Sequence, residues 1–292
     1  MRSYLFRVIV LIGNNILVLF GNGHSKSIYH NGWIDLNKNG EMDIYENPQA
    51  EIDDRIDDLL SQMNIKEKTC QMATLYGYGR VVEDELPTED WKEEIWQDGI
   101  GNIDEHLNGL DRDYTQTEWS YPHSKHAKAI NTVQKFFIEE TRLGIPVDFT
   151  NEGIRGLCHE KATSFPAQIG IGSTWDVELV SQIGHITGKE ARALGYSNVY
   201  SPILDISRDP RWGRIVETYG ENPYLTAELG VAQVKAIQSE GVASTPKHFA
   251  VYSIPKGGRD GDARTDPNTT WRKVETLYLY PFKKAFMEGG AM

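Results

Sequence analysis

From about residue 125 onward, segments with helical periodicity alternate with short apolar segments, and this alternation constrains the fold more than any other feature. Apolar residues recur at helical spacing from Ile130 to Phe137. The predicted strands that follow are 144–149, 199–206 and 242–249, with a fourth beginning at Ala291, and the predicted helices are 177–194, 227–237 and 273–287. Strands that alternate with helices are typical of parallel βαβ units.

These units favour an α/β barrel over a nucleotide-binding sheet. No glycine-rich phosphate loop follows the strand 144–149, so a dinucleotide fold has little support. We therefore predict an α/β fold with a (β/α) barrel of the TIM type, whose chemistry would lie where strands run into the following loops. Because the sequence stops at Met292, where the last predicted strand has only begun, we expect the barrel to be incomplete at its C-terminus.

The composition is that of a large globular domain and excludes one class of partner. The 292 residues are 39% hydrophobic, which is enough for a substantial core. The formal charge of −12 disfavours binding to nucleic acid, because phosphate neutralisation needs a basic surface. The 7 tryptophans and 14 tyrosines suit either sugar rings or the core and its rim. Cys70 and Cys158 are too few for a metal site or a disulfide framework, and are either reduced or joined in one bridge.

Residues 1–23 have the pattern of an export signal. Arg2 and Arg7 precede the apolar run 8–20, and small residues follow it. The run is short for a membrane-spanning helix, and two asparagines interrupt it. We predict a signal peptide, and hence a periplasmic or secreted protein with no membrane association after cleavage; a buried helix is the alternative.

Residues 24–50 form a predicted N-terminal extension that carries the pattern of an EF-hand calcium loop. In the run from Asp35 to Glu46, oxygen-bearing residues occupy the ligand positions and Gly40 occupies the sharp turn. The predicted ligands are Asp35, Asn37, Asn39, Glu41 through its carbonyl, Asp43 and Glu46. The possible structural Ca²⁺ would serve as a clip rather than a sensor, because a single loop is present. A surface turn rich in asparagine and glycine is the alternative.

The domain predicted over residues 51–292 begins with a helix. Apolar residues recur at helical spacing from Ile52 to Met63, while the neighbouring aspartates lie away from that stripe. Residues 76–125 lack clear periodicity, and we predict a long loop or an irregular excursion around a site there.

Polar side chains follow three successive predicted strands. Glu152 lies in the loop after the first strand, Arg214 ends the loop after the second, and Lys247 and His248 lie at the end of the third. Because the carboxyl ends of barrel strands meet at one end of the barrel, we expect these four side chains to converge. A carboxylate, a guanidinium, an ammonium and an imidazole can together hold several hydroxyls of one sugar. Local ion pairs at the barrel rim are the alternative.

Five motifs, in order along the chain, resemble glycoside hydrolase family 3. They are Gly144-Ile145-Pro146, the loop 151–156, Ser164-Phe165-Pro166, the run from Arg208 to Arg214, and Lys247-His248-Phe249. The similarity covers roughly residues 46–292, and it is greatest to secreted bacterial β-glucosidases that carry a calcium-loop-like N-terminal extension.

The resemblance implies a retaining, exo-acting hydrolase of β-linked glucosides or xylosides, with no cofactor for catalysis. It implies that Glu152, Arg214, Lys247 and His248 bind hydroxyls of the terminal sugar. The rest of the run from Arg208 to Arg214 would mainly hold its loop in place. Family members tend to have a strained or cis peptide in the Lys-His-Phe segment, and we expect one here.

Two departures from the family pattern bear on the substrate. Glu152 and Arg155 stand where the family often has aspartate and histidine, and the longer carboxylate could crowd a hexose hydroxymethyl group. A β-xylosidase therefore remains an alternative. In addition, no Pro-Gly-His-Gly loop follows Lys247-His248-Phe249, which disfavours the N-acetylglucosaminidase branch.

The two carboxylates that retaining hydrolysis needs are not identifiable in this sequence. In the family the nucleophilic aspartate stands in a Ser-Asp motif well after Lys-His-Phe, and the acid/base usually comes from a second domain. Asp260, Asp262 and Asp266 lack that context. We therefore expect a truncated domain with no catalytic residue within this chain, a nucleophile beyond Met292, and no hydrolysis by the 292-residue chain alone.

The resulting prediction is hydrolysis of terminal non-reducing β-linked glucose from β-glucosides or oligosaccharides, by a retaining mechanism, in the full-length protein. Two alternatives stay open: a β-xylosidase of the same family, and a non-catalytic, calcium-clipped sugar-binding protein. The predicted partner is a β-linked oligosaccharide or glucoside.

Overall fold

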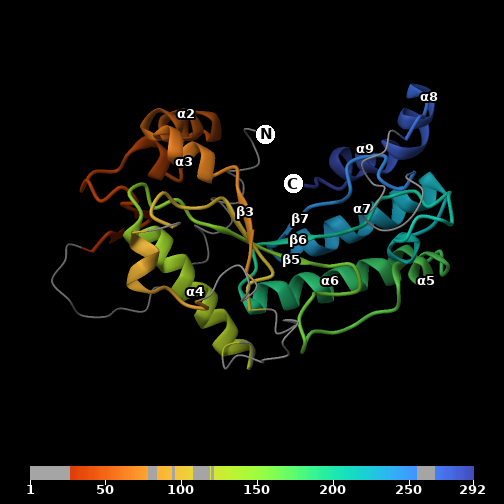
Figure 1. Cartoon of the computed structure of the whole chain (residues 1–292), viewed down its shortest axis with the longest axis horizontal. Helices are drawn as coiled ribbons and strands as arrows, with labels where there is room; N and C mark the ends of the chain where they lie inside the picture. Colours follow the sequence, from red (N-terminus) through yellow and green to blue (C-terminus); the bar gives the residue numbers. More distant parts are fainter. Residues whose placement is uncertain (1–26, 78–83, 94–95, 108–118, 120–121, 255–266) are drawn as a thin grey trace. The chain divides into compact units, whose positions relative to one another are not determined.

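The computed structural model describes residues 27–77, 84–93, 96–107, 119, 122–254 and 267–292 (Figure 1). The chain divides into two compact units, Met1–Thr150 and Asn151–Met292, called unit 1 and unit 2 below. The predicted signal peptide lies outside the described residues. Within the described ranges, no helix has both the length and the apolar character needed to cross a membrane.

Unit 1 combines a hairpin, three parallel strands and three α-helices among its described residues. Its elements are β1 (Tyr29–His30), β2 (Trp33–Ile34), η1 (Ile44–Glu46), α2 (Ile52–Gln62), α3 (Ile65–Cys70), β3 (Thr74–Tyr76), η2 (Glu89–Lys92), β4 (Asn102–Asp104), α4 (His123–Glu140) and the start of β5 (Asp148–Glu152). Strands β1 and β2 pair antiparallel. Strand β4 pairs parallel with β3 on one side and with β5 on the other.

The helix predicted from Ile52 is confirmed as α2, and its apolar stripe faces the core of unit 1. Ile56 and Leu59 on α2 pack in a cluster with Leu36 and Tyr45 of the N-terminal extension and with Ile138 at the end of α4. The extension is therefore part of the core of unit 1, because it contributes buried apolar side chains.

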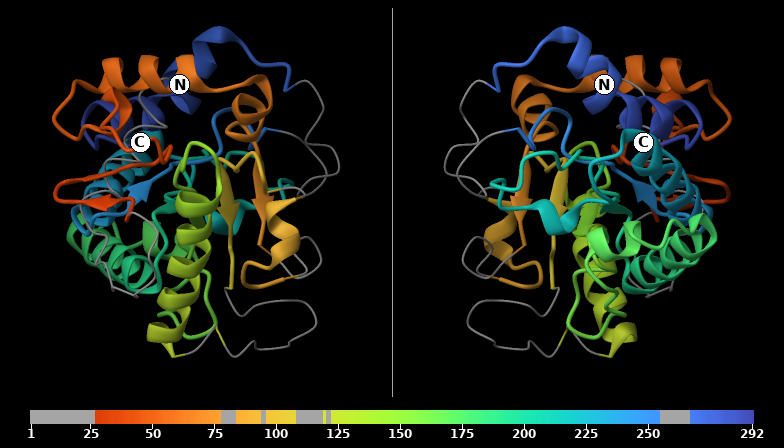
Figure 2. Two further views of the ribbon diagram at one scale, coloured as in Figure 1. Left: turned by 90° about the vertical axis from the view of Figure 1, so that its left-hand side faces the viewer. Right: turned by 90° about the vertical axis from the view of Figure 1, so that its right-hand side faces the viewer.

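The prediction of an irregular region over residues 76–125 is wrong for β4, whose residues 102–104 are buried between two parallel strands. A strand of three residues is too short to show a periodicity of its own. Figure 2 shows α4 running beside β3 and β4, and Phe137 on α4 makes an edge contact with Trp96 at 5.5 Å between ring centroids.

Unit 2 contains the end of β5, two further parallel strands and several helices. Its remaining elements are α5 (Gln168–Gly172), α6 (Val177–Leu194), β6 (Asn198–Tyr200), η3 (Ile215–Glu217), α7 (Pro223–Ser239), β7 (Ala243–Ser244), α8 (Trp271–Lys273), the π-helical η4 (Val274–Tyr278) and α9 (Tyr280–Met287). Strands β6 and β7 pair parallel, with Asn198 opposite Ala243. These parallel strands and helices confirm the predicted α/β class.

Helices α6 and α7 lie side by side in unit 2 (Figure 1), and glycines on α6 permit their close approach. A Cβ atom at Gly184 would lie 2.7 Å from the Cβ of Ala236, and one at Gly188 would lie 2.8 Å from the carbonyl oxygen of Ile237. Asp176 caps α6 by accepting a hydrogen bond from the backbone N–H of Leu179.

The observed strands β6 and β7 are shorter than the predicted strands 199–206 and 242–249. Pro202 and Pro246 follow them, and proline has no N–H to donate to a ladder. The two segments nevertheless continue side by side, because the N–H of Lys247 donates to the carbonyl of Pro202 and the N–H of Leu204 donates to the carbonyl of Lys247. The predicted strand at Ala291 does not form within the described residues.

Candidate sugar-binding site

A compact set of charged side chains follows the strands of unit 2. Glu152 is the last residue of β5, and Lys247 follows β7. The Lys247 ammonium donates to both oxygens of the Glu152 carboxylate, at 2.5 Å to Oε2. The Lys247 side chain is only 15% exposed, so this ion pair is largely withdrawn from solvent. Two of the four residues predicted to bind a sugar thus form an ion pair with each other.

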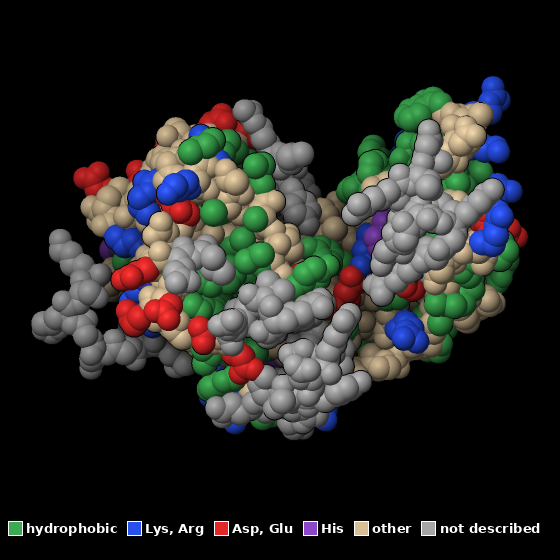
Figure 3. All heavy atoms as spheres, viewed as in Figure 1, with side chains coloured by type: hydrophobic (Ala, Val, Ile, Leu, Met, Phe, Trp, Pro, Cys, Tyr) green, Lys and Arg blue, Asp and Glu red, His purple; other side chains and the backbone are tan. Residues whose placement is uncertain are grey.

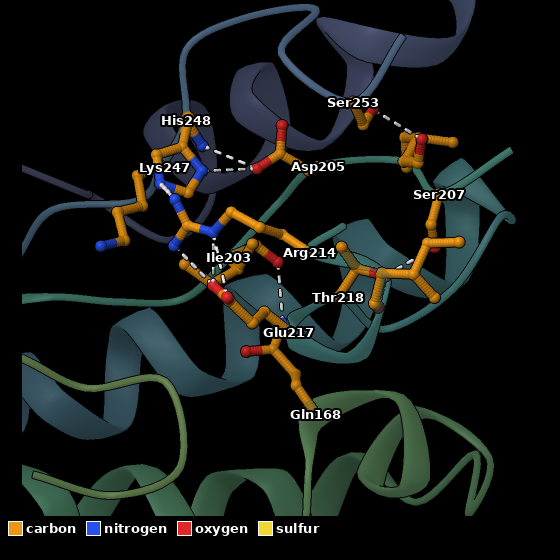
Figure 4. Close-up of polar contacts among 12 residues, drawn as sticks. Gln168, Ile203, Asp205, Ser207, Arg214, Glu217, Thr218, Lys247, His248 and Ser253 are labelled. Carbon is orange, nitrogen blue, oxygen red and sulfur yellow. Dashed lines mark hydrogen bonds and ion pairs between the residues drawn. The ribbon is translucent and has the colours of Figure 1, made fainter. Parts of the chain in front are cut away.

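Arg214 is the centre of a second set of contacts (Figure 4). It directly precedes η3, and Glu217 at the end of that short helix lies opposite its guanidinium. The Nε of Arg214 lies 3.0 Å from each Glu217 oxygen, and Nη2 lies 2.5 Å from Oε2. Burial by itself lowers the pKa of Arg214, but the hydrogen bond and charge of Glu217, together with Tyr252, outweigh burial and raise it. Arg214 therefore carries a permanent charge in this site.

His248 connects Arg214 to a buried carboxylate. Its ring Nε2 lies 3.0 Å from Nη1 of Arg214, and its ring Nδ1 lies 2.7 Å from Oδ2 of Asp205. The same Asp205 oxygen accepts the backbone N–H of His248 at 3.1 Å, and the Asp205 side chain is 1% exposed. The Lys247–His248 peptide bond is cis, as expected for the Lys-His-Phe segment, and the Phe249–Ala250 bond is cis as well.

Aromatic rings border the Arg214–His248 contact. The ring of Tyr252 lies 4.8 Å from that of His248 and 5.4 Å from that of buried Trp212, and the Arg214 guanidinium carbon lies 5.7 Å from the Tyr252 centroid. Figure 3 shows a histidine side chain at the surface beside Lys or Arg side chains on the face turned to the viewer. This combination of fixed charge and aromatic surface can hold the hydroxyls and the apolar face of a sugar.

The four predicted site residues therefore form two contacting pairs, Glu152–Lys247 and Arg214–His248, joined through adjacent residues of one segment. Their binding of a sugar remains a prediction. Elsewhere in the Arg208–Arg214 run, Asp209 accepts hydrogen bonds from the backbone and guanidinium of Arg211 and Trp212 is buried. These contacts agree with the predicted role of that run in holding its loop.

The sequence prediction omitted three members of this network: Asp205, Glu217 and Tyr252. Asp205 lies near the end of the predicted strand 199–206, so the rule that selected Glu152 and Lys247 could have found it. Glu217 stands three residues after Arg214, which is a helical spacing for ion pairs. Tyr252 gave no signal, because one tyrosine among fourteen is not distinctive.

In the predicted calcium loop of unit 1, two carboxylates accept backbone N–H groups of the loop itself. Glu46 accepts the backbone N–H groups of Leu36, Asn37 and Asp43, at 2.6, 3.2 and 3.0 Å. Asp35 accepts those of Asn39 and Gly40, at 3.0 and 2.9 Å.

The remaining predicted ligands of this loop are also engaged with one another. The amides of Asn37 and Asn39 both donate to Oδ2 of Asp43. Within the part of the chain that the structure describes, no group of three or more His, Cys, Asp or Glu side chains is placed to hold a metal ion. The calcium prediction is therefore not supported, and the alternative of a turn closed by hydrogen bonds fits the contacts.

Two further expectations have different outcomes. Cys70 and Cys158 are not joined in a disulfide. Asp260, Asp262 and Asp266 lie outside the described residues.

Comparisons with known proteins bear on the fold and the family of the chain. Residues 55–292 match the model of the glycosyl hydrolase family 3 N-terminal domain. A periplasmic β-glucosidase of Salmonella typhimurium is 30% identical over 240 residues, covering 80% of this chain and 28% of the relative. A β-xylosidase of Formosa agariphila is 36% identical over 163 residues, covering 51% of this chain and 22% of the relative.

Solved structures lead to the same assignment. A β-glucosidase from Erythrobacter marinus superposes with a TM-score of 0.68 and 25% identity, over 82% of this chain and 30% of that one. The chain spans less than half the length of the curated relatives it matches. The predicted TIM-barrel-like α/β class is confirmed by these neighbours. The chain belongs to glycoside hydrolase family 3, through the N-terminal domain of that family.

Proposed function

We propose that this chain supplies a sugar-binding subsite of a hydrolase that removes terminal β-linked glucose with retention of configuration. The observation that carries the proposal is the pair of contacts Glu152–Lys247 and Arg214–His248, which gathers four hydroxyl-binding groups in unit 2. The nucleophile and the acid/base that such a mechanism requires are not assigned to any residue of this chain.

Solved structures named β-glucosidase, one of them in complex with glucose, support glucose as the sugar, and xylose is the second candidate. Relatives named β-glucosidase align over 80% and 87% of the chain, and a putative β-xylosidase of Formosa agariphila aligns over 84% of it, so coverage alone does not separate the two sugars. The specific observation in favour of xylose is the length of Glu152. Glutamate has one methylene more than the aspartate that the family often has at this position, and a longer side chain near C5 of the sugar would leave less room for a hydroxymethyl group. Export to the periplasm or beyond is part of the same proposal, supported by the pattern of residues 1–23.

Calorimetric titration of the 292-residue chain with glucose and with xylose tests this proposal. We expect glucose to bind, and Lys247→Ala to abolish measurable binding because it removes the ammonium and leaves Glu152 without its partner. Lys189→Ala, which removes an exposed lysine from α6, is the matched control and should bind as the wild type does. Equal binding by Lys247→Ala and Lys189→Ala would contradict the proposed subsite.

A further inference from the structure

The Arg214–His248 contact defines which ring nitrogen of His248 carries the proton. Every nitrogen of a guanidinium bears hydrogen and has no lone pair to offer, so Nη1 of Arg214 is the donor in this 3.0 Å contact. Nε2 of His248 is then the acceptor, and it bears no proton. The histidine ring is consequently neutral whenever this contact is made.

The opposite side of the ring has the complementary partner. A neutral imidazole without a proton on Nε2 has one on Nδ1, and Nδ1 lies 2.7 Å from Oδ2 of Asp205. Asp205 is buried, and the same oxygen also accepts the backbone N–H of His248. A buried carboxylate that accepts two N–H groups from one residue fixes both the backbone position and the ring tautomer of that residue.

The far side of the guanidinium is held in the same way. Glu217 accepts from Nε and Nη2 of Arg214, while His248 accepts from Nη1, so the planar group is fixed from two directions (Figure 4). The chain of contacts therefore runs from Asp205 through His248 and Arg214 to Glu217. Removing one end would release the arginine on one side only.

We propose that Asp205 is a positioning residue of the sugar subsite, which holds His248 in the Nδ1–H tautomer and thereby orients the Arg214 guanidinium. In this tautomer the one lone pair of Nε2 accepts from Nη1 of Arg214, so a sugar hydroxyl can donate to Nε2 only by displacing the guanidinium. The proposal rests on the proposed function for its effect on sugar binding, but the tautomer itself does not.

The experiment has two independent measurements on the 292-residue chain: the ¹⁵N resonances of the histidine rings, and the affinity for glucose. His248 is assigned by the signal that His248→Gln removes. In the wild type we expect Nδ1 to be protonated and Nε2 to be unprotonated. A wild-type spectrum with the proton on Nε2 would overturn the inference, whatever the result of the sugar titration.

Two substitutions at one position separate hydrogen bonding from packing. Asp205→Leu keeps the approximate volume but removes the acceptor, so we expect loss of the Nδ1–H preference and about a tenfold weaker glucose affinity, or about 1.4 kcal/mol. Asp205→Asn keeps one oxygen acceptor and should retain the wild-type tautomer and most of the affinity. Asp176→Asn, at the exposed cap of α6, is the matched control for the charge change.

The outcomes distinguish the two proposals. If Asp205→Leu keeps the Nδ1–H tautomer, Asp205 does not set it and the inference fails. If the wild type has the expected tautomer but does not bind glucose, the inference on Asp205 stands and the proposed function fails. If Asp205→Leu does not fold, the wild-type spectrum still decides the tautomer, and a proton on Nε2 there, or loss of the wild-type tautomer in Asp205→Asn, would overturn the inference.

Discussion

The acidic loop of unit 1 and the charged network of unit 2 use the same kind of side chain in opposite ways. In the Asp35–Glu46 loop, the carboxylates accept mainly backbone N–H groups of the loop itself. In unit 2, Glu152 and Glu217 instead accept from the long side chains of Lys247 and Arg214. Backbone partners cannot leave without unfolding the loop, whereas side-chain partners can turn to a ligand.

This difference separates a hydrogen-bonded turn in unit 1 from a candidate binding site in unit 2. An EF-hand pattern specifies where oxygen atoms occur along the chain, but not whether backbone amides already occupy them. The first consequence is that each cluster should respond to a different perturbation. Loss of a charge should affect ligand binding in unit 2 and only stability in unit 1.

The largest expected effect is that of Glu217→Ala. Arg214 is 8% exposed, and the substitution leaves its guanidinium without its main acidic partner. Breaking a buried ion pair costs about 3–5 kcal/mol, and because Glu217 is partly exposed we expect about 3 kcal/mol. Urea denaturation measures this loss.

Glucose titration of the same variant addresses the comparison directly. We expect binding to fall together with stability, because Arg214 is released on one side. The double variant Arg214→Met/Glu217→Met should recover stability but not binding. Recovery of both would show that the pair is only structural.

The next prediction extends the comparison to two histidines. His248 in unit 2 is held by charged partners, whereas His106 in unit 1 is 1% exposed. Burial lowers the pKa of His106 to about 4, with the charge of His126 acting in the same direction and hydrogen bonds with backbone groups opposing it. The folded state therefore resists protonation at a pH where the unfolded chain, with a pKa near 6.5, accepts a proton.

The sign of the pH effect follows from proton binding. Between pH 6.5 and 4 the unfolded chain binds more protons at this residue, so the free energy of unfolding falls as pH falls through that window. The loss attributable to His106 is up to about 3 kcal/mol. Urea denaturation at pH 7 and pH 5 should show a smaller difference for His106→Gln than for the wild type. An identical difference would exclude His106 as a cause.

Glu152→Asp tests whether the side-chain partners in unit 2 also select the sugar. The shorter carboxylate makes room beside C5, and a difference of one carbon is worth about 1–3 kcal/mol. For the proposed hydrolase we expect the ratio of kcat/KM for p-nitrophenyl β-glucoside over p-nitrophenyl β-xyloside to rise. Lys189→Ala should leave that ratio unchanged. An unchanged ratio in Glu152→Asp would mean that this residue does not distinguish hexose from pentose.

Much of this architecture could be predicted from sequence, and the exceptions have physical causes. The helix at Ile52 and the cap at Asp176 are local features, with periodicity and capping chemistry visible in the chain. Strand β4 was missed because three buried residues carry no periodicity. Glu152 and Lys247 could be selected as strand-end residues, but their pairing across 95 residues is a tertiary property.

The Asp205–His248 contact shows the same limit at the site. Asp205 is a buried carboxylate, and its partner His248 lies 43 residues further along the chain, on a parallel segment. Residues 202–204 pair with Lys247, and this pairing brings Asp205 next to His248. No local pattern in either segment predicts the pairing. The calcium prediction was unsupported for a related reason, since most of the N–H groups that occupy the loop oxygens belong to the backbone, which is common to any sequence.

The smallest expected effect is that of calcium on the Asp35–Glu46 loop. Because Glu46 and Asp35 are already occupied by N–H groups and the Asp43 carboxylate accepts two side-chain amides, an ion would have to displace these contacts before binding. We expect the same Tm in excess calcium and in EDTA. Glu46→Gln should lower stability by about 2 kcal/mol through its hydrogen bonds alone, and equally in both conditions. The contrary result is a Tm that rises with calcium in the wild type and not in Asp35→Ala. It would show that the ion displaces these contacts, and the contrast drawn between the loop of unit 1 and the network of unit 2 would then fail.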